Sequence, residues 1–315
     1  MVSSPFESLL GQQQAITLLT RAIECDRIAP AYLFVGPEGV GRTLAAKAFL
    51  SRIIQIHNKG HRTRTSADNH PDILWVEPTY LQSGKLIPAS AFDREPEARP
   101  KSRPQIRVAQ IRDITKFVNQ APLESSRLLV IVDQAELMGE ASANGLLKTL
   151  EEPGNASLIL ISTTVETLLP TIVSRCQRIP FHPLSQTDMN TILTRQGYGD
   201  ILEDPQVTAL AMGSPGKAIT HWEMRASIET ELLNRCMTLP KTDLDALYIA
   251  KDIEASLDMP TQLWLIDYLQ QHYWYQTQNR AVVNLFEETK TALKQYVQPL
   301  LTWEVTWLKI YDSEH

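Results

Sequence analysis

Four short, largely apolar runs constrain the fold of this chain more than any other feature of its sequence. They cover residues 31–35, 72–76, 128–133 and 158–164. Helical spacing of apolar residues separates them, over residues 12–26, 43–56, 106–119 and 141–152. Buried parallel strands have continuous apolar sequences, and strands that alternate with helices form a parallel sheet covered by helices on both faces. The sequence therefore predicts an α/β fold for the first half of the chain.

The second half of the chain follows a different pattern. After about Phe181 strand-like runs become scarce, and helical spacing continues to the C-terminus. In one stretch the apolar residues are Leu265, Ile266, Leu269 and Tyr273, which share one side of a helix. We therefore expect an all-α region after the α/β part.

Residues 78–104 are expected to form a long surface loop, because prolines recur within them. This stretch and the helix after it carry a basic set, which is Arg94, Arg99, Lys101, Arg103, Arg107 and Arg112. One interpretation is a contact with DNA, and the other is a solvated loop and helix face.

The composition excludes several classes of protein. The chain has 315 residues, 43% of them hydrophobic, and a net charge of −6, which argues against a surface built throughout to bind nucleic acid. Its cysteines, Cys25, Cys176 and Cys236, are scattered, so we expect neither disulfides nor a metal cluster, as in a cytoplasmic protein. No apolar run has the length of a membrane-spanning helix, so we expect no membrane contact.

Residues 36–43 (Gly-Pro-Glu-Gly-Val-Gly-Arg-Thr) match the phosphate-binding Walker A pattern G-x-x-x-x-G-K-[ST], except that Arg42 replaces the lysine. Gly36, Gly39 and Gly41 let backbone N–H groups face a phosphate, and the Thr43 hydroxyl would bind magnesium. Arginine keeps the charge but is longer and planar, so occupancy by ATP or ADP with magnesium stays open. The alternative is a glycine-rich turn without a ligand.

Asp133 ends the third apolar run, where the aspartate of a Walker B motif would hold magnesium directly or through water. The next position normally carries a glutamate that activates the attacking water, and here it is Gln134. An amide cannot take a proton, so we expect general-base catalysis to fail. Glu136 is a candidate substitute, while a simpler interpretation makes Asp133 and Glu136 caps of the following helix.

Several segments together carry a resemblance to a known family. They are residues 31–34 (Ala-Tyr-Leu-Phe) with the phosphate loop, 69–72 (Asn-His-Pro-Asp), 106–112 (Ile-Arg-Val-Ala-Gln-Ile-Arg), 144–153 (Asn-Gly-Leu-Leu-Lys-Thr-Leu-Glu-Glu-Pro) and 171–177 (Thr-Ile-Val-Ser-Arg-Cys-Gln). In this order they resemble the bacterial replicative clamp-loader subunits of the delta-prime and gamma/tau group. The resemblance covers about residues 6–220.

The resemblance implies a P-loop AAA+ module over residues 1–182, a helical lid over 183–224 and a helical collar, for oligomerisation, over 225–315. The implied partners are gamma/tau and delta type subunits in a five-subunit ring, a sliding clamp, and primed DNA reached through this complex of DNA polymerase III. Arg175 of the Ser-Arg-Cys motif would reach a neighbour's nucleotide as an arginine finger. A lone arginine is otherwise a solvated or ion-paired surface residue.

Related subunits usually carry a four-cysteine zinc module between the phosphate-loop helix and the His-Pro-Asp segment. Residues 51–69 contain no cysteine here, so we expect no zinc.

Three departures resemble the delta-prime type rather than the motor subunits. Arg42 replaces the lysine, Gln134 replaces the glutamate, and Gly216 stands where the lid of a motor subunit carries an arginine. We expect a subunit with little or no ATP turnover of its own. The main alternative is a catalytically active gamma/tau-type ATPase, and a second is a P-loop kinase or transferase with a small substrate.

Overall fold

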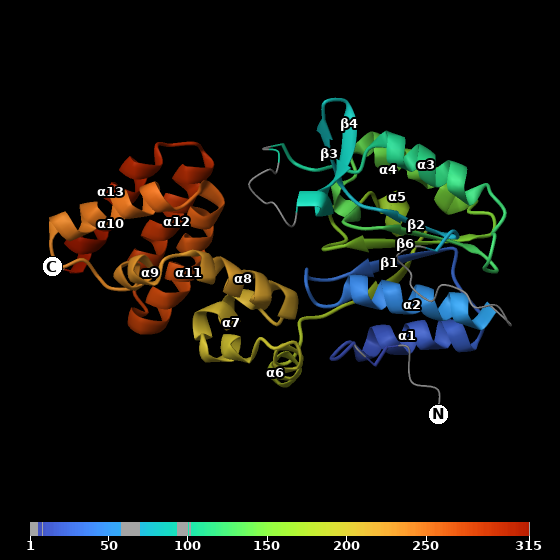
Figure 1. The fold of residues 1–315 in the computed structure, drawn as a ribbon, viewed down its shortest axis with the longest axis horizontal. Helices are drawn as coiled ribbons and strands as arrows, with labels where there is room; N and C mark the ends of the chain where they lie inside the picture. The colour runs from blue at the N-terminus through green and yellow to red at the C-terminus, as the bar shows by residue number, and fades with distance from the viewer. Residues whose placement is uncertain (1–5, 8, 58–69, 93–99, 101, 315) are drawn as a thin grey trace. The chain divides into compact units, whose positions relative to one another are not determined.

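The computed structural model describes residues 6–7, 9–57, 70–92, 100 and 102–314. The chain divides into two compact units, Met1–Asp188 and Met189–His315. The first is an α/β unit and the second is helical, as the colours of Figure 1 show. The prediction of an α/β part followed by an all-α part is confirmed, while its division of residues 183–315 into lid and collar stays a prediction.

The first unit is built on a parallel sheet of five strands. These are β1 (Ala31–Val35), β2 (Ile73–Val76), β5 (Leu128–Val132), β6 (Ala156–Ser162) and β7 (Gln177–Pro180). Their order across the sheet is β2-β5-β6-β1-β7, and every neighbouring pair is parallel. Strand β1 lies between β6 and β7, so the chain runs from β1 to one side of the sheet and from β6 to the other. Ligands of open parallel sheets bind at the carboxyl ends of the strands near such a change of direction.

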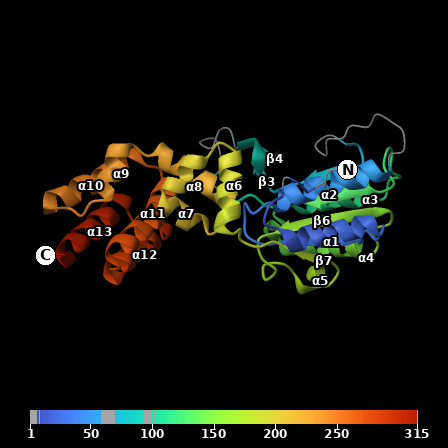
Figure 2. The same cartoon turned by 90° about the horizontal axis from the view of Figure 1, so that it is seen from below.

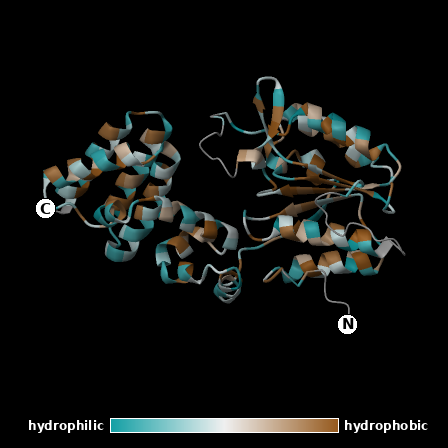
Figure 3. Ribbon diagram, viewed as in Figure 1, coloured by the Kyte–Doolittle hydropathy of each residue, from teal (hydrophilic) through white to brown (hydrophobic). Residues whose placement is uncertain are grey.

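Helices cover both faces of this sheet, as predicted. Figure 1 shows α1 (Gln13–Glu24) and α2 (Arg42–His57) on one face. On the other face lie α3 (Val108–Val118), α4 (Glu140–Glu151) and the short α5 (Pro170–Val173). The strands between them are largely brown, the colour of hydrophobic residues, in Figure 3. Every residue of β5 and β6 is buried. This burial on both faces explains why these strands are continuous apolar runs.

The expectation of a long loop over residues 78–104 is wrong for its first part. β3 (Thr79–Gln82) and β4 (Lys85–Pro88) form an antiparallel hairpin, and a 3-10 helix, Ala89–Phe92, follows. The hairpin turns at Ser83 and Gly84, which both have positive φ, as tight hairpin turns require. The rings of Tyr80 and Phe92 pack edge to face, 5.3 Å apart, and this contact buries part of the segment.

The second unit consists of helices, and its first residue, Met189, lies within α6. They are α6 (Gln186–Arg195), α7 (Pro205–Ala211), α8 (Pro215–Ser227), α9 (Thr230–Cys236), α10 (Asp243–Ser256), α11 (Met259–Thr277), α12 (Arg280–Lys294) and α13 (Pro299–Glu314), with a 3-10 helix at Gly199–Glu203. Helices α10, α13, α12 and α11 lie side by side in that order (Figure 2). Trp303 and Trp307 are fully buried, so these tryptophans belong to the core of the unit. No described helix has the length and apolarity needed to cross a membrane.

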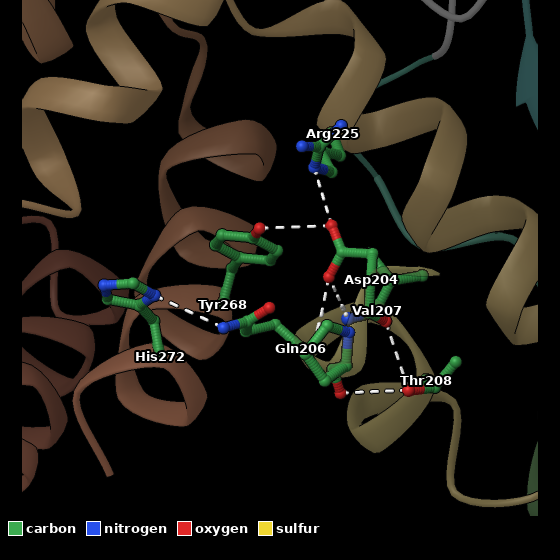
Figure 4. Close-up of polar contacts among 8 residues, drawn as sticks. Asp204, Gln206, Val207, Thr208, Arg225, Tyr268 and His272 are labelled. Carbon is green, nitrogen blue, oxygen red and sulfur yellow. Dashed lines mark hydrogen bonds and ion pairs between the residues drawn. The ribbon is translucent and has the colours of Figure 1, made fainter. Parts of the chain in front are cut away.

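Asp204 joins three helices of the second unit (Figure 4). Its Oδ1 accepts hydrogen bonds from the backbone N–H groups of Gln206 and Val207, 3.1 and 3.0 Å away, and so caps α7. Its Oδ2 forms an ion pair with Arg225 of α8, 2.8 Å from Nε, and accepts a hydrogen bond from the Tyr268 hydroxyl of α11 at 3.3 Å. A buried carboxylate is tolerated when it is paired in this way, so the cluster fixes α7, α8 and α11 together.

Candidate nucleotide-binding site

The predicted site residues meet at one edge of the sheet. The phosphate loop follows β1, Asp133 follows β5, and Thr163 follows β6. The strands are parallel, with Val35 beside Ser162 and Val132 beside Leu160, so their carboxyl ends coincide. A pocket of about 390 Å³ lies there. Its lining residues are Glu38, Gly39, Gly41, Arg42, Thr43, Leu44, Asp133, Gln134, Glu136, Leu137 and Thr163.

The phosphate loop needs glycine for two separate reasons. Gly36 lies against the segment after β7, where an added Cβ would be 2.2 Å from the Phe181 carbonyl oxygen. Gly41 has φ +101°, and an added Cβ would be 2.7 Å from Leu9 Cδ1. Gly36 shapes the loop without lining the pocket, whereas Gly39 and Gly41 lie in the pocket wall. Helix α2 begins at Arg42, so its free N–H groups are available to an anion.

Gln12 holds the loop in place, a role that no sequence motif indicates. Its side chain is 2% exposed, and its Nε2 donates to the carbonyl oxygens of Val40, at 3.2 Å, and His182, at 2.7 Å. Its Oε1 accepts the backbone N–H of His182 at 3.0 Å. One buried amide therefore holds the phosphate loop against the segment that follows β7.

Arg42 lies within the pocket wall. The residue is only 8% exposed, and its Nη1 is enclosed without a hydrogen-bond partner. Burial lowers the pKa of Arg42, and the carboxylates of Glu136, Asp133 and Glu38 oppose that change, in this order of strength. The guanidinium of Arg42 thus faces negative charge supplied by the chain itself.

The acidic side of the pocket contains Asp133, Gln134 and Glu136. Burial raises the pKa of Asp133, although the Gln134 backbone N–H, 2.9 Å from Oδ1, and Arg42 both act to lower it. Gln134 has a left-handed backbone, φ +49°, and its exposed side chain lines the pocket. Glu136 also lines the pocket. Its Oε1 accepts the Thr163 backbone N–H at 3.2 Å, and its Oε2 is enclosed without a hydrogen-bond partner.

A magnesium nucleotide fits this pocket in part. The loop N–H groups suit phosphate, and the Thr43 hydroxyl and Asp133 carboxylate are oxygen ligands of the kind that magnesium prefers. Arg42 fits less well, since it is enclosed near three carboxylates. For zinc, residues 58–69 of the expected module position lie outside the described residues. The described part of the chain brings together no group of three or more His, Cys, Asp or Glu side chains suited to a metal.

Arg175 lies away from this pocket and does not line it. Strand β7 begins at Gln177, which pairs with Tyr32 near the start of β1, whereas the phosphate loop follows the end of β1. At about 3.3 Å per strand residue, roughly 13 Å separates Tyr32 from Gly36 along the sheet. Arg175 Nε donates to Glu151 Oε1 at 3.0 Å, and its Nη1 donates to the Thr171 carbonyl oxygen at 3.0 Å.

The His-Pro-Asp segment is structural. Asp72 is 1% exposed, and its carboxylate accepts the backbone N–H groups of Leu123, Glu124 and Ser125 at 2.7, 2.8 and 2.6 Å. His70 Nδ1 accepts the backbone N–H of Asp72 at 3.1 Å. The segment therefore holds the turn that leads into β5.

The segment over residues 213–217 also has a clear local role. Met212 and Gly213, both with positive φ, end α7. Ser214 caps α8, because its Oγ accepts the Lys217 backbone N–H at 3.2 Å. Gly216 lies in the first turn of α8.

Of the basic set, Arg94, Arg99 and Lys101 lie outside the described residues.

Comparison with known proteins gives matches along nearly the whole chain. A family model described as DNA polymerase III, delta subunit matches residues 11–185, and one described as Cyanobacterial DNA polymerase III delta prime, C-terminal domain matches residues 187–310. DNA polymerase III subunit delta' of Bacillus subtilis is 31% identical over 193 residues, which are 59% of this chain and 52% of that protein. DNA polymerase III subunit tau/gamma of Haemophilus influenzae is 28% identical over 216 residues, which are 67% of this chain and 29% of that protein. The chain thus spans about half the length of the first relative.

A solved structure shows the same fold. A DNA polymerase III gamma subunit-related protein of Thermotoga maritima has a TM-score of 0.55 and 17% identity, with 96% of this chain and 100% of that chain covered. The sheet order, the phosphate loop and the helical second unit define a P-loop AAA+ module followed by an all-α region. The chain belongs to the DNA polymerase III delta-subunit family of clamp-loader proteins, and its second half matches the delta-prime type. This confirms the family resemblance.

Proposed function

We propose that the chain is a delta-prime-like subunit of a replicative clamp loader, which helps to open a sliding clamp and place it on primed DNA for DNA polymerase III. The observation that carries this proposal is the contrast between two sites of the first unit. The pocket after β1 holds Asp133 but has Gln134 beside it, whereas Arg175 lies near the opposite edge of the sheet. Partner subunits of the gamma/tau and delta types would complete a five-subunit ring in the cytoplasm.

The pocket geometry supports little or no ATP turnover by this chain alone. The Gln134 amide cannot accept a proton, and loss of a general base typically costs about 10²–10⁴-fold in rate. Glu136 is a poor replacement, because its Oε1 already accepts the Thr163 N–H and its Oε2 is enclosed. ATP or ADP with magnesium would then be at most a bound ligand, held by Thr43, Asp133 and the loop N–H groups.

Arg175 would serve the nucleotide of an adjacent subunit. Arg175 precedes β7, whose first residue pairs with Tyr32, and roughly 13 Å of β1 separates Tyr32 from Gly36 of the phosphate loop, which argues against a role in cis. Its guanidinium is partly exposed and its partner Glu151 is half exposed, so the pair is open to exchange. An arginine brought to a transferring phosphoryl group stabilises the charge that develops on it.

The second unit offers a surface for assembly. Tyr296, Val297, Leu301 and Val305 are exposed on α13 and on the turn before it, while Trp303 and Trp307 of the same helix are buried. An exposed apolar face on a well-packed helix is typical of an interaction surface. We propose that this face packs against other subunits as part of the collar.

Reconstitution tests the proposal. Mixed with gamma/tau and delta type subunits, the purified chain should co-elute as one complex of defined mass, while the chain alone should show negligible ATP turnover. Arg42→Lys with Gln134→Glu should restore some turnover at this site where a neighbouring subunit supplies an arginine finger. Turnover by the unchanged chain alone, abolished by Asp133→Asn, would favour the alternative of an active gamma/tau-type ATPase.

A further inference from the structure

The charged side chains that line the pocket after β1 are mostly acidic. Its charged lining residues are one cation, Arg42, and the three acids Glu38, Asp133 and Glu136. A phosphate group that enters such a pocket gains one positive partner and meets three negative ones. Without a magnesium ion, a polyphosphate is therefore opposed by the charged side chains that line the pocket, whatever the loop N–H groups contribute.

Arg42 itself is enclosed in the wall of this pocket. At 8% exposure, with Nη1 shut off from solvent and from hydrogen bonds, its charge must be balanced from within the protein. Glu136 Oε2 is enclosed and unpartnered in the same pocket. The Thr163 N–H fixes the other Glu136 oxygen at 3.2 Å, which holds this carboxylate beside the pocket that Arg42 lines.

We propose that Arg42 is a built-in counter-ion for the pocket carboxylates, chiefly Glu136, and that it makes the module independent of nucleotide and magnesium. The charge at position 42 thus stabilises the first unit instead of binding phosphate. This inference rests on the proposed role of the chain as a subunit without turnover, and it specifies what replaces the nucleotide there.

The inference has two measurable consequences. The melting temperature of the full chain should change by less than about 1 °C when ADP and magnesium are added, because the pocket gains little from them. Arg42→Met should lower the melting temperature without ligands by roughly 4 °C or more, since it removes the positive charge that faces Glu136 and Asp133 across the pocket. The same substitution in a Glu136→Gln background should cost less than half as much, because the two residues compensate each other.

The experiment is a double-substitution cycle on the full chain, read by differential scanning fluorimetry with and without ADP and magnesium. Matched controls are Arg112→Met and Glu166→Gln, which change exposed residues of the same unit and should leave the melting temperature within about 1 °C. Glu136→Gln alone provides a second test if Arg42→Met fails to fold. It frees Arg42 from its counter-charge, so ADP should then raise the melting temperature by roughly 2–4 °C.

Two outcomes would overturn the inference. In the first, ADP and magnesium raise the melting temperature of the original chain by several degrees, and Arg42→Met abolishes this rise. Without ligands, Arg42→Met leaves the melting temperature unchanged. Arg42 would then be an ordinary phosphate ligand. The other is an equal cost of Arg42→Met with and without Glu136, or no response of Glu136→Gln to ADP. Ring assembly by the unchanged chain is a separate measurement, so failure here and failure of the proposed function remain distinguishable.

Discussion

Arg175 donates its Nε–H to Glu151 Oε1 at 3.0 Å, and its Nη2 pairs with the same oxygen. The contact joins the Leu-Glu-Glu-Pro segment to the Ser-Arg-Cys segment, which are two of the stretches that carry the resemblance to clamp-loader subunits. Both side chains are partly exposed, and exposed ion pairs contribute about 0–1 kcal/mol. A phosphate of a neighbouring subunit would therefore compete well for this arginine.

Glu151→Gln should change the free energy of unfolding by less than about 1 kcal/mol, because solvent screens the pair that it removes. Urea denaturation of the full chain at neutral pH measures this. A loss of several kcal/mol would show that the pair is part of the fold, and the exchange of partners proposed for Arg175 would then be too costly.

Asp72→Asn should destabilise the chain by roughly 1–3 kcal/mol, since an amide replaces a carboxylate that accepts three backbone N–H groups. The exposed Asp113→Asn is the matched control and should have little effect.

The stability that Asp72 contributes should decrease at acid pH. Burial alone would raise the pKa of Asp72, but the N–H groups of Leu123, Glu124 and Ser125, with the Ser125 hydroxyl, outweigh it and lower the pKa below 3.8. The contribution of Asp72 to the free energy of unfolding is therefore complete above about pH 4, and it falls as the pH drops through the lowered pKa. Below that range the unfolding free energies of the original chain and Asp72→Asn should converge. A gap that stays constant down to pH 2 would contradict the assignment.

His221 should make the second unit less stable at acid pH. Trp264 Nε1 donates to His221 Nδ1 at 3.0 Å, which requires an unprotonated nitrogen. Burial, and then Lys217, lower the pKa of His221 below 6.5, against the opposing effects of Asp267 and the Leu210 carbonyl. The folded state thus binds this proton more weakly than the unfolded state, so stability is complete above about pH 6.5 and falls below it.

His221→Gln keeps an acceptor for Trp264 but does not titrate. Denaturation curves followed by tryptophan fluorescence between pH 8 and 5 should show a flatter pH dependence for this variant than for the original chain. Parallel curves for the two proteins would rule out His221 as the titrating group.

Leu301→Glu should weaken assembly with partner subunits without unfolding the chain. Leu301 is 51% exposed on α13, so the charge costs little in the monomer but much in a buried interface. Size-exclusion chromatography with partner subunits measures assembly, and circular dichroism checks the fold. Asn284→Glu adds the same charge at an exposed position of α12 and should assemble normally. Full assembly of Leu301→Glu would exclude this face from the interface.

Much of the fold could be predicted from the sequence where a strand is buried on both faces and is therefore apolar throughout. β5 and β6 are buried on both faces, so their apolar runs are unmistakable. β7 escaped notice because it is an edge strand in which only Ile179 is fully buried among polar neighbours. The β3–β4 hairpin was hidden by the prolines around it, although Pro88 lies opposite Thr79, whose own N–H donates to the Gln105 carbonyl and not to β4.

The site could be predicted only where it follows from strand ends. Gly41, Arg42 and Asp133 come together because parallel strands end at one edge. The direction of Glu136 depends on the left-handed backbone of Gln134 and a single 3-10 turn, which residue types alone do not determine. Gln12 could not be found because its partner His182 lies 170 residues away in sequence.

The most direct test of the account replaces Arg175 by alanine in a reconstituted complex with unchanged gamma/tau and delta type subunits. DNA-stimulated ATP turnover and clamp loading are measured together, with Arg195→Ala as a control arginine. We expect a normal complex and a partial loss of turnover, because one site among several loses a group worth about 10³–10⁵ in rate. Clamp loading should fall more. Arg175→Lys should rescue little, since an ammonium lacks the guanidinium fork. Unchanged turnover together with unchanged clamp loading would contradict the account and leave Arg175 as a surface partner of Glu151.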